Sequence, residues 1–357
     1  MAINRKLWGR TPDGKAIYKY TMTNASGASV VLGSVGAAIV GVNVPDKDGK
    51  LADVVLGYGK AESYFGDGPC FGKCPGRFAN RIAAGRFTLD GKTYTLPVNN
   101  GPNHLHGGPQ GFQNQVWDSR KHKGGVEFKY VSADGEMGYP GNVVVVARYE
   151  WSEENELRLT FSAKSDARTV INLTNHAYFN LKGEGEGDIR DHRLQVFADE
   201  YIPYDETVAP TGEVLPVEGT PMDFREPVVF GDRMDNPFFA TGRGIDNGWA
   251  LPGWREYNDR PGILQRAAVL SGGGRTMEVW TTFPCLQVYS GNYVERHIGK
   301  SGRIYDVQHA VCMEAQGFPD AVNHPLFPSP VLRPGETFTG TCQYRFVNAT
   351  NGISLLK

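Results

Sequence analysis

Apolar and polar residues alternate with a period of two along much of the chain. The alternation is clear in residues 87–96, 143–151 and 156–161, where every second side chain would lie on one face of a strand. Asp90-Gly91 interrupts the first of these stretches and is typical of a two-residue hairpin turn. A sustained 3.6-residue period is rare, and residues 60–65 are compatible with one short helix. The pattern therefore predicts an all-β chain, built as a large sandwich of antiparallel sheets.

The domain organisation follows from the spread of turn-forming residues. The 357 residues include 45 glycines and 22 prolines, and these are distributed evenly, without a low-complexity linker. Residues 182–188 and 252–262 are polar and rich in glycine, which predicts surface loops between strands. Since no repeat of 20–50 residues indicates a propeller, we predict a single domain over residues 1–357.

Composition and charge exclude several classes of partner. Lysine and arginine (37) nearly balance aspartate and glutamate (39), for a net charge of −2, so neither a nucleic acid nor a membrane partner is predicted. No apolar stretch approaches the ~20 residues that span a bilayer. The first residues lack the apolar region of a secretory signal, which favours a cytoplasmic location, although a signal already removed would leave no trace. An odd number of cysteines favours free apolar thiols over a disulfide framework or a zinc set: Cys70, Cys74, Cys285, Cys312 and Cys342.

Residues 172–181 are the first segment in which polar side chains stand where a plain core would not place them. Read as a strand, one face carries only side chains that form hydrogen bonds: Asn172, Thr174, His176, Tyr178 and Asn180. A solvated outer face is the alternative interpretation, but such faces are usually rich in lysine and glutamate, which are missing here. The pattern favours a cleft that binds a polyol.

Glu314 is the second candidate, because it lies in the otherwise apolar segment 311–320, with Cys312 and Gln316 on its own face. Desolvation raises the pKa of a partly buried carboxyl group, which makes it a better proton acceptor near neutral pH. A structural salt bridge explains a buried glutamate equally well, and the strand alone does not separate the two interpretations.

Residues 76–82 and 99–108 supply three further candidates, Arg81, His104 and His106. Arg81 offers a rigid fork of donors to vicinal hydroxyls or to a ring oxygen. His104 and His106 are two residues apart and could bind a metal, but glycines and a proline indicate a loop, and no carboxylate lies at a matching spacing. A grip on a neutral ligand rich in hydroxyls is favoured over zinc.

Asp246 and Gln287 are weaker candidates. Each can bind adjacent sugar hydroxyls, although an aspartate in a turn often serves only the turn. The chain has no Gly-x-Ser-x-Gly elbow, no phosphate-binding glycine loop that opens a helix, and no basic–aromatic stacking platform.

Four motifs, in order and at matching separations, resemble the galactose mutarotase (aldose 1-epimerase) family. They are Gly76-Arg-Phe-Ala-Asn-Arg-Ile82, Asn103-His-Leu-His-Gly-Gly108, Asn172-Leu-Thr-Asn-His-Ala-Tyr-Phe-Asn-Leu181 and Glu314-Ala-Gln-Gly-Phe-Pro-Asp-Ala-Val-Asn323. The resemblance runs from about residue 15 to residue 347, and the lead-in Leu332-Arg-Pro-Gly-Glu336 agrees with it. It implies a galactose-mutarotase-like β-supersandwich of antiparallel sheets, with a sugar bound in an open cleft on one sheet.

The resemblance also implies an activity and roles for single residues. The activity is aldose 1-epimerase, which interconverts the α and β anomers of free hexoses such as galactose and glucose. Glu314 matches the family's catalytic base, His176 its catalytic acid, and His106 its second active-site histidine. Substrate-binding positions of the family fall on Asn80, Arg81, Asp246 and Gln287. One base and one acid suffice for this reaction, so no cofactor and no metal is implied; the partner is a monosaccharide, and the predicted state is a monomer or weak homodimer.

Three departures from the family pattern leave the choice of sugar epimer open. Gly317-Phe318 stands where Asn-Trp is frequent, Asp246-Asn247-Gly248 where Asp-His-Asn is frequent, and Phe283 where glutamine is common.

Three alternative functions remain. An epimerase for phosphorylated hexoses would need further basic residues, and a non-catalytic sugar-binding module would lack the acid–base pair. The third alternative is a glycoside hydrolase or lyase, and a hydrolase usually needs two carboxylates beside the scissile bond.

Overall fold

Strands and short 3₁₀ turns form all the regular structure that the computed structural model describes, which covers residues 1–259 and 262–347. The prediction of an all-β chain is confirmed. The short helix expected at residues 60–65 is a single 3₁₀ turn, Ala61–Tyr64. Among the described residues, no helix is long and apolar enough to cross a membrane.

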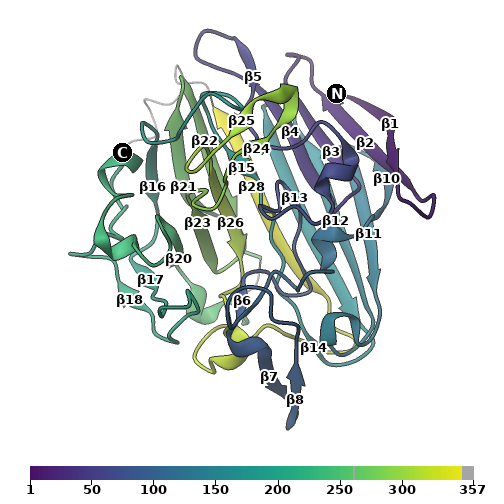
Figure 1. The fold of residues 1–357 in the computed structure, drawn as a ribbon, viewed down its shortest axis with the longest axis vertical. Helices are drawn as coiled ribbons and strands as arrows, with labels where there is room; N and C mark the ends of the chain where they lie inside the picture. The colour runs from purple at the N-terminus through teal and green to yellow at the C-terminus, as the bar shows by residue number, and fades with distance from the viewer. Residues whose placement is uncertain (260–261, 348–357) are drawn as a thin grey trace.

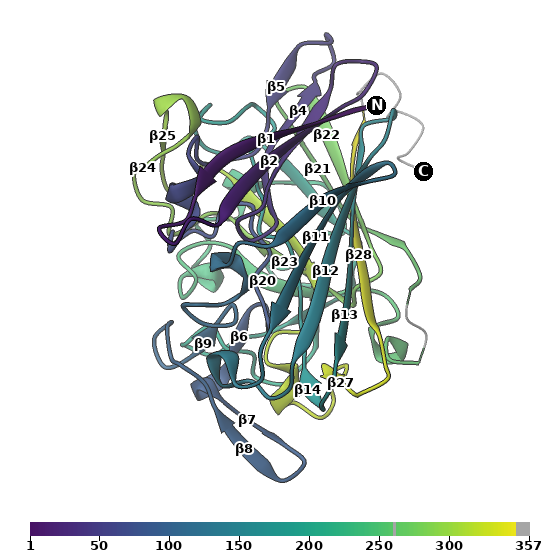
Figure 2. The ribbon, with the colours of Figure 1, turned by 90° about the vertical axis from the view of Figure 1, so that its right-hand side faces the viewer.

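The largest sheet has nine antiparallel strands in the order β10-β11-β12-β13-β28-β22-β21-β16-β19. Strands β10 to β13 lie side by side in Figures 1 and 2. Two of the periodic stretches of the sequence became β12 and β13, and the alternate residues Leu157, Leu159 and Phe161 are fully buried. The bounds are β10 Asp118–His122, β11 Gly125–Ser132, β12 Val143–Trp151, β13 Glu156–Ser165, β16 Arg193–Val196, β19 Val228–Val229, β21 Gln265–Gly272, β22 Arg275–Thr281 and β28 Phe338–Val347.

A second sheet of six strands, in the order β15-β26-β23-β20-β17-β18, carries the candidate site. Leu286, Val288 and Met313 from its central strands belong to the same apolar core as the inner side chains of the nine-stranded sheet. One face of the second sheet is therefore committed to packing, and polar side chains are left to the other face. The bounds are β15 Tyr178–Phe179, β17 Glu200–Ile202, β18 Leu215–Pro216, β20 Asp246–Ala250, β23 Cys285–Tyr289 and β26 Val311–Gln316.

The remaining strands form one five-stranded sheet and four pairs. The five-stranded sheet runs in sequence order: β1 Ala2–Arg10, β2 Ala16–Thr23, β3 Ser29–Gly33, β4 Ala38–Pro45 and β5 Leu51–Asp53. The pairs are β6 Arg81–Ile82 with β9 His104–Leu105, β7 Arg86–Leu89 with β8 Lys92–Thr95, β14 Thr169–Val170 with β27 Val331–Leu332, and β24 His297–Ile298 with β25 Ile304–Tyr305.

The hairpin β7–β8 confirms the turn predicted at Asp90-Gly91, and it projects from the body of the molecule in Figure 1. Both turn residues have a positive φ, 53° for Asp90 and 76° for Gly91. A two-residue turn of this kind matches the twist of the flanking strands, and glycine adopts it without steric cost.

Two expectations from the sequence need correction. Residues 172–181 are not one strand, because only Tyr178–Phe179 pairs within a ladder. Residues 182–188 form a loop as predicted, but the expected loop 252–262 includes a 3₁₀ turn, Trp254–Glu256, with Trp254 buried; residues 260–261 of that segment lie outside the described part. The five cysteines are free and buried, as predicted.

Candidate active site

An open cavity of about 570 Å³ lies on the polar face of the six-stranded sheet. Its volume falls within the range of small-molecule sites, roughly 300–1,000 Å³. Six of the seven site residues predicted from the sequence line this cavity: Asn80, Arg81, His106, His176, Asp246 and Glu314. They come from segments that are far apart in the chain, so the fold brings them together.

Strand register explains why the polar side chains share one face. Gln287 of β23 lies directly opposite Glu314 of β26 and, on its other side, opposite Gly248 of β20. Since side chains alternate along a strand, Asp246, two residues before Gly248, points to the same side as Gln287 and Glu314. The neighbours Leu286, Val288 and Met313 belong to the apolar core instead.

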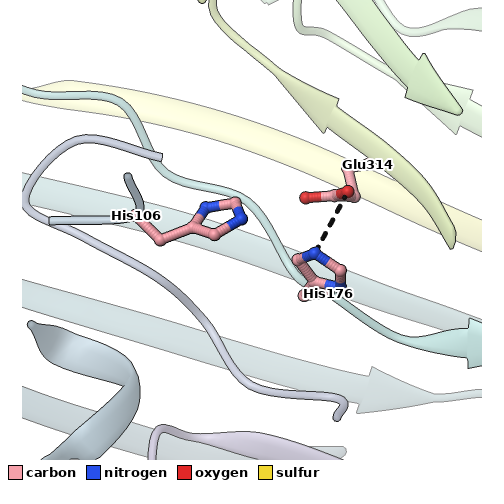
Figure 3. Close-up of side chains that lie close together, drawn as sticks. All are labelled: His106, His176 and Glu314. Atoms are coloured by element: carbon pink, nitrogen blue, oxygen red, sulfur yellow. Dashed lines mark ion pairs between the residues drawn. The ribbon is translucent and has the colours of Figure 1, made fainter. Parts of the chain in front are cut away.

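His176 and Glu314 form a buried acid–base pair, with 3.5 Å between His176 Nε2 and Glu314 Oε1 (Figure 3). Burial raises the pKa of Glu314 well above its usual value, and the charge of Asp246 adds to this effect while Arg81 opposes it. Burial lowers the pKa of His176 to about 4. Both shifts favour the uncharged form of each group, a protonated Glu314 beside a neutral His176.

The alternative interpretation of Glu314 as a structural salt bridge is not supported. Within residues 1–259 and 262–347, no lysine or arginine nitrogen lies within 4.0 Å of its carboxylate. Its Oε2 is buried without a hydrogen-bond partner in the same part of the chain. A buried carboxyl oxygen left unpaired is costly in a finished core, and here it borders a cavity open to a ligand.

Both the backbone and the ring of His176 are fixed by neighbouring groups. Its backbone N–H donates to the Lys73 carbonyl at 2.8 Å, and Gly72 N–H donates to the His176 carbonyl at 2.9 Å. The ring stacks on Tyr178, with centroids 5.0 Å apart, and meets the edge of Tyr289. These contacts leave the ring little freedom, so its Nε2 stays directed at Glu314.

Arg81, Asp246 and Gln287 form a second polar group in the wall. Arg81 Nη2 lies 3.4 Å from Asp246 Oδ2, and Gln287 Nε2 donates to Asp246 Oδ1 at 2.8 Å. The Asp246 carboxylate is thus fixed by partners on both oxygens. Gln287 stands behind Asp246 and borders a smaller recess rather than the main cavity.

His104 and His106 have separate environments, and their spacing does not reflect a shared metal. His104 is fully buried, with Nδ1 2.6 Å from the Pro97 carbonyl and Nε2 2.7 Å from the Tyr139 hydroxyl. Both of its ring nitrogens are occupied, so His104 supports the loop. His106 alone of the two lines the cavity.

The polar face predicted for residues 172–181 was wrong for three of its five members. Asn172, Thr174 and Asn180 are buried and donate to main-chain carbonyls. Their amides and hydroxyl satisfy backbone groups of neighbouring segments where regular ladders are missing. From this set only His176 and Tyr178 reach the cavity.

The departures from the family pattern lie mainly in packing positions. Phe318 packs against Trp254, with centroids 5.1 Å apart, and Phe283 packs against Phe338. Neither phenylalanine lines the main cavity, and Gly248 borders only the smaller recess. The two phenylalanines therefore leave the lining of the main cavity unchanged.

Sequence reasoning missed an ion pair between Lys73 and Asp67 beneath the site. The two side chains are 0% and 3% exposed. Lys73 Nζ also donates to the Tyr64 carbonyl at 2.5 Å and to Asn114 Oδ1 at 3.1 Å. A signal was present, because Lys73 is the only charge in residues 68–76. The pair matters for the site because the Lys73 carbonyl accepts a hydrogen bond from the backbone N–H of His176.

Replacing Lys73 with methionine is expected to lower the free energy of unfolding by about 3 kcal/mol, because it leaves Asp67 as an uncompensated buried charge. Denaturant unfolding measures the change. The exposed Lys60→Met is the control, with an expected change within about 0.5 kcal/mol. An equal, small effect of both substitutions would contradict the role given to the ion pair.

The model of the aldose 1-epimerase family matches residues 18–345 of the chain. The chain belongs to the aldose 1-epimerase family. It is 41% identical over 347 residues to galactose mutarotase of Rattus norvegicus, covering 97% of this chain and 99% of the relative. It is 35% identical to aldose 1-epimerase of Escherichia coli, covering 94% and 97%. The crystal structure of galactose 1-epimerase from Lactobacillus acidophilus superposes with a TM-score of 0.83 at 31% identity, covering 97% and 99%. The predicted family and β-sandwich fold are confirmed.

Proposed function

We propose that this member of the family interconverts the α and β anomers of free hexoses such as galactose and glucose, with Glu314 as general base and His176 as general acid. The buried His176–Glu314 pair at the cavity wall is the observation that carries this assignment. A base and an acid side by side are what ring opening requires, and each contributes on the order of 10²–10⁴ in rate.

Ring opening removes one proton and delivers another. Glu314 takes the proton of the anomeric hydroxyl, and His176, as imidazolium, protonates the ring oxygen as the C1–O5 bond breaks and the C1 carbonyl forms. C1 then turns about the C1–C2 bond, and the reverse transfers close the ring on the other face. No proton is consumed over the cycle.

The burial of the pair assists this exchange. The reactive form is the ion pair of carboxylate and imidazolium, reached when the proton passes from Glu314 to His176 across 3.5 Å. Desolvation disfavours that charged form. Ring opening leaves both groups neutral, because Glu314 gains a proton and His176 loses one. Burial therefore favours the opening step, and the bound sugar must stabilise the ion pair for ring closure.

The rest of the wall is suited to hold hydroxyls remote from C1 while C1 turns. Asp246 presents a fixed carboxylate, which can accept from adjacent hydroxyls, and Arg81 and Asn80 present donors beside it. We assign Gln287 an indirect part in binding, since it donates to Asp246 from behind. His106 and Arg81 lie on the side given to the ring oxygen.

A free sugar is favoured over a phosphorylated one by the charges of the wall. Among the described residues that line the cavity, Arg81 is the one arginine or lysine, and it is paired with Asp246; Glu206, Asp246 and Glu314 are acidic.

Polarimetry of freshly dissolved α-D-galactose and α-D-glucose is expected to show acceleration over buffer. For glucose 6-phosphate we expect kcat/KM at least ~10-fold lower than for glucose, because the phosphate dianion would meet Glu206 and Asp246 and no unpaired lysine or arginine of the described wall. Faster turnover of the phosphate would reverse the assignment, and no acceleration with any free hexose would refute the activity.

A glycoside hydrolase is disfavoured because the second carboxylate is engaged. Both Asp246 oxygens have partners, one Arg81 and the other Gln287, whereas hydrolysis needs a free general acid and a second carboxylate at the bond. Incubation with aryl glycosides is expected to release no sugar.

We further propose that the chain works as a monomer or weak homodimer in the cytoplasm. The acid–base pair, Arg81 and Asp246 all come from one chain, so the site is complete without a second copy. Five free cysteines fit a reducing compartment. Sedimentation at two concentrations would check the first statement.

A further inference from the structure

The two histidines beside Glu314 differ in what their Nδ1 atoms contact. His106 Nδ1 lies 3.0 Å from the backbone nitrogen of Asn80, whose N–H points at it. A backbone N–H can only donate, so this nitrogen must carry a lone pair and the ring proton must sit on Nε2. The tautomer of His106 thus follows from the main chain.

The contact between Asn80 and His106 is part of a rigid local structure. His106 N–H donates to the Asn80 carbonyl at 3.0 Å, so the two residues bind each other reciprocally. Both adopt a left-handed backbone, with φ of 65° and 53°, and Asn80 Oδ1 accepts from the Arg81 N–H at 2.8 Å. Moving the Asn80 amide away from the ring would break this set of contacts.

A second proton on His106 would set two N–H groups against each other at Nδ1, where the Asn80 N–H is the one hydrogen-bond contact among the described residues. The titratable groups around the ring are His104, His176, Glu314 and Arg81. Burial lowers the pKa of His106 well below its usual value, and His176 and Arg81 lower it further. Geometry and surroundings both favour a neutral ring.

His176 has a different partner. Its Nδ1 lies 3.4 Å from Cys312 Sγ, and a thiol can act as a weak donor or a weak acceptor. Either protonation state of the His176 ring is therefore tolerated at Nδ1, while Nε2 faces Glu314. The site allows a charge change on this histidine.

We propose that the Asn80 main-chain amide acts as a positioning group that keeps His106 a neutral Nε2–H donor, so that the site contains one fixed donor and one proton carrier. This inference rests on the proposed function. His106 then donates a hydrogen bond to the sugar without exchanging its proton.

The same geometry bears on metal binding. Ligand atoms of His106, His176 and Glu314 lie within 4.8 Å of one another, a grouping that resembles a metal site. A histidine that binds a metal through Nε2 carries its proton on Nδ1 and donates it to an acceptor, whereas here Nδ1 itself accepts. His106 is therefore unsuited to complete a three-residue zinc site.

Nitrogen NMR of the full chain with ¹⁵N-labelled histidine reads the tautomer without any need for turnover. His106→Gln identifies the His106 signals by their disappearance. We expect a protonated Nε2 and a bare Nδ1, unchanged between about pH 5 and about pH 8, where an ordinary histidine titrates. A protonated Nδ1, or a titration midpoint in that interval, would overturn the proposal even if the epimerase activity were demonstrated.

Two substitutions then test the donor role. Glutamine places an amide N–H near the position of Nε2, whereas asparagine reaches only the position of Nδ1. We expect kcat of His106→Gln to exceed that of His106→Asn by ~10-fold, with the pH limits of the wild type retained. Equal losses in both variants, or a displaced pH limit in His106→Gln, would instead assign proton transfer to His106. Near-ultraviolet circular dichroism controls for folding; should either variant not fold, the tautomer measured in the wild-type protein decides.

Discussion

Glu314→Gln is expected to lower kcat for the mutarotation of galactose by ~10³- to 10⁴-fold, which is the upper range of what one general base contributes. Glutamine has the shape of glutamate but cannot accept the proton of the anomeric hydroxyl. Because Glu314 Oε2 has no hydrogen-bond partner in the described structure and Oε1 faces only His176, the amide disturbs no structural bond. KM should therefore change much less than kcat, as polarimetry at several galactose concentrations will measure.

The exposed Glu62→Gln provides the matched control for this variant, since Glu62 lies in the 3₁₀ turn Ala61–Tyr64, outside the cavity wall. Its kcat should stay within about twofold of the wild type. Thermal unfolding of both variants verifies that the fold is retained. A Glu314→Gln protein with full kcat would remove Glu314 from the mechanism while leaving the family assignment intact.

Loss of the acid is the second large effect. His176→Gln is expected to reduce kcat by ~10³-fold, because glutamine cannot protonate the ring oxygen. The expected change in the pH profile is more specific than the loss of rate. In the wild type the pair must hold one proton, and a second proton binds only as the pH falls through the His176 pKa of about 4. The acidic limit of kcat/KM should therefore lie at about pH 4, the pKa of His176.

Without His176 the remaining activity depends on an ionised Glu314 alone. The pKa of that carboxyl is raised by burial and by Asp246, so the acidic limit of kcat/KM should move to higher pH in His176→Gln. His122→Gln, on β10 and away from the cavity wall, is the control and should retain the wild-type limit. A limit that stays in place in His176→Gln would show that another group supplies the proton.

Local periodicity predicted the strands well. Strands β12 and β13 and the hairpin β7–β8 lie where the alternation and Asp90-Gly91 placed them. Each of these features depends on side-chain direction over a few residues and on the backbone of a two-residue turn. Such information is contained within a short segment, so tertiary contacts did not alter it.

The segment 172–181 shows where local pattern misleads. Its polar residues look alike in the sequence, but Asn172, Thr174 and Asn180 bind distant main-chain carbonyls, whereas His176 faces the cavity. Whether a side chain binds a main-chain carbonyl or faces the cavity depends on the segments packed beside it. The burial of Lys73 and Asp67 is similarly visible only when the loop that carries them is placed beneath His176.

Glu314 and His176 illustrate the division between sequence and tertiary structure. By itself the sequence determined the all-β class, the main strands and, through four ordered motifs, the family. The resemblance also led us to propose Glu314 and His176 as the proton-transfer pair. Strand register decided that Glu314 faces a cavity rather than a cation. A backbone amide at residue 80 decided which tautomer His106 adopts. Register and tautomer depend on atoms from segments far apart in the chain, and only the folded structure brings those atoms together.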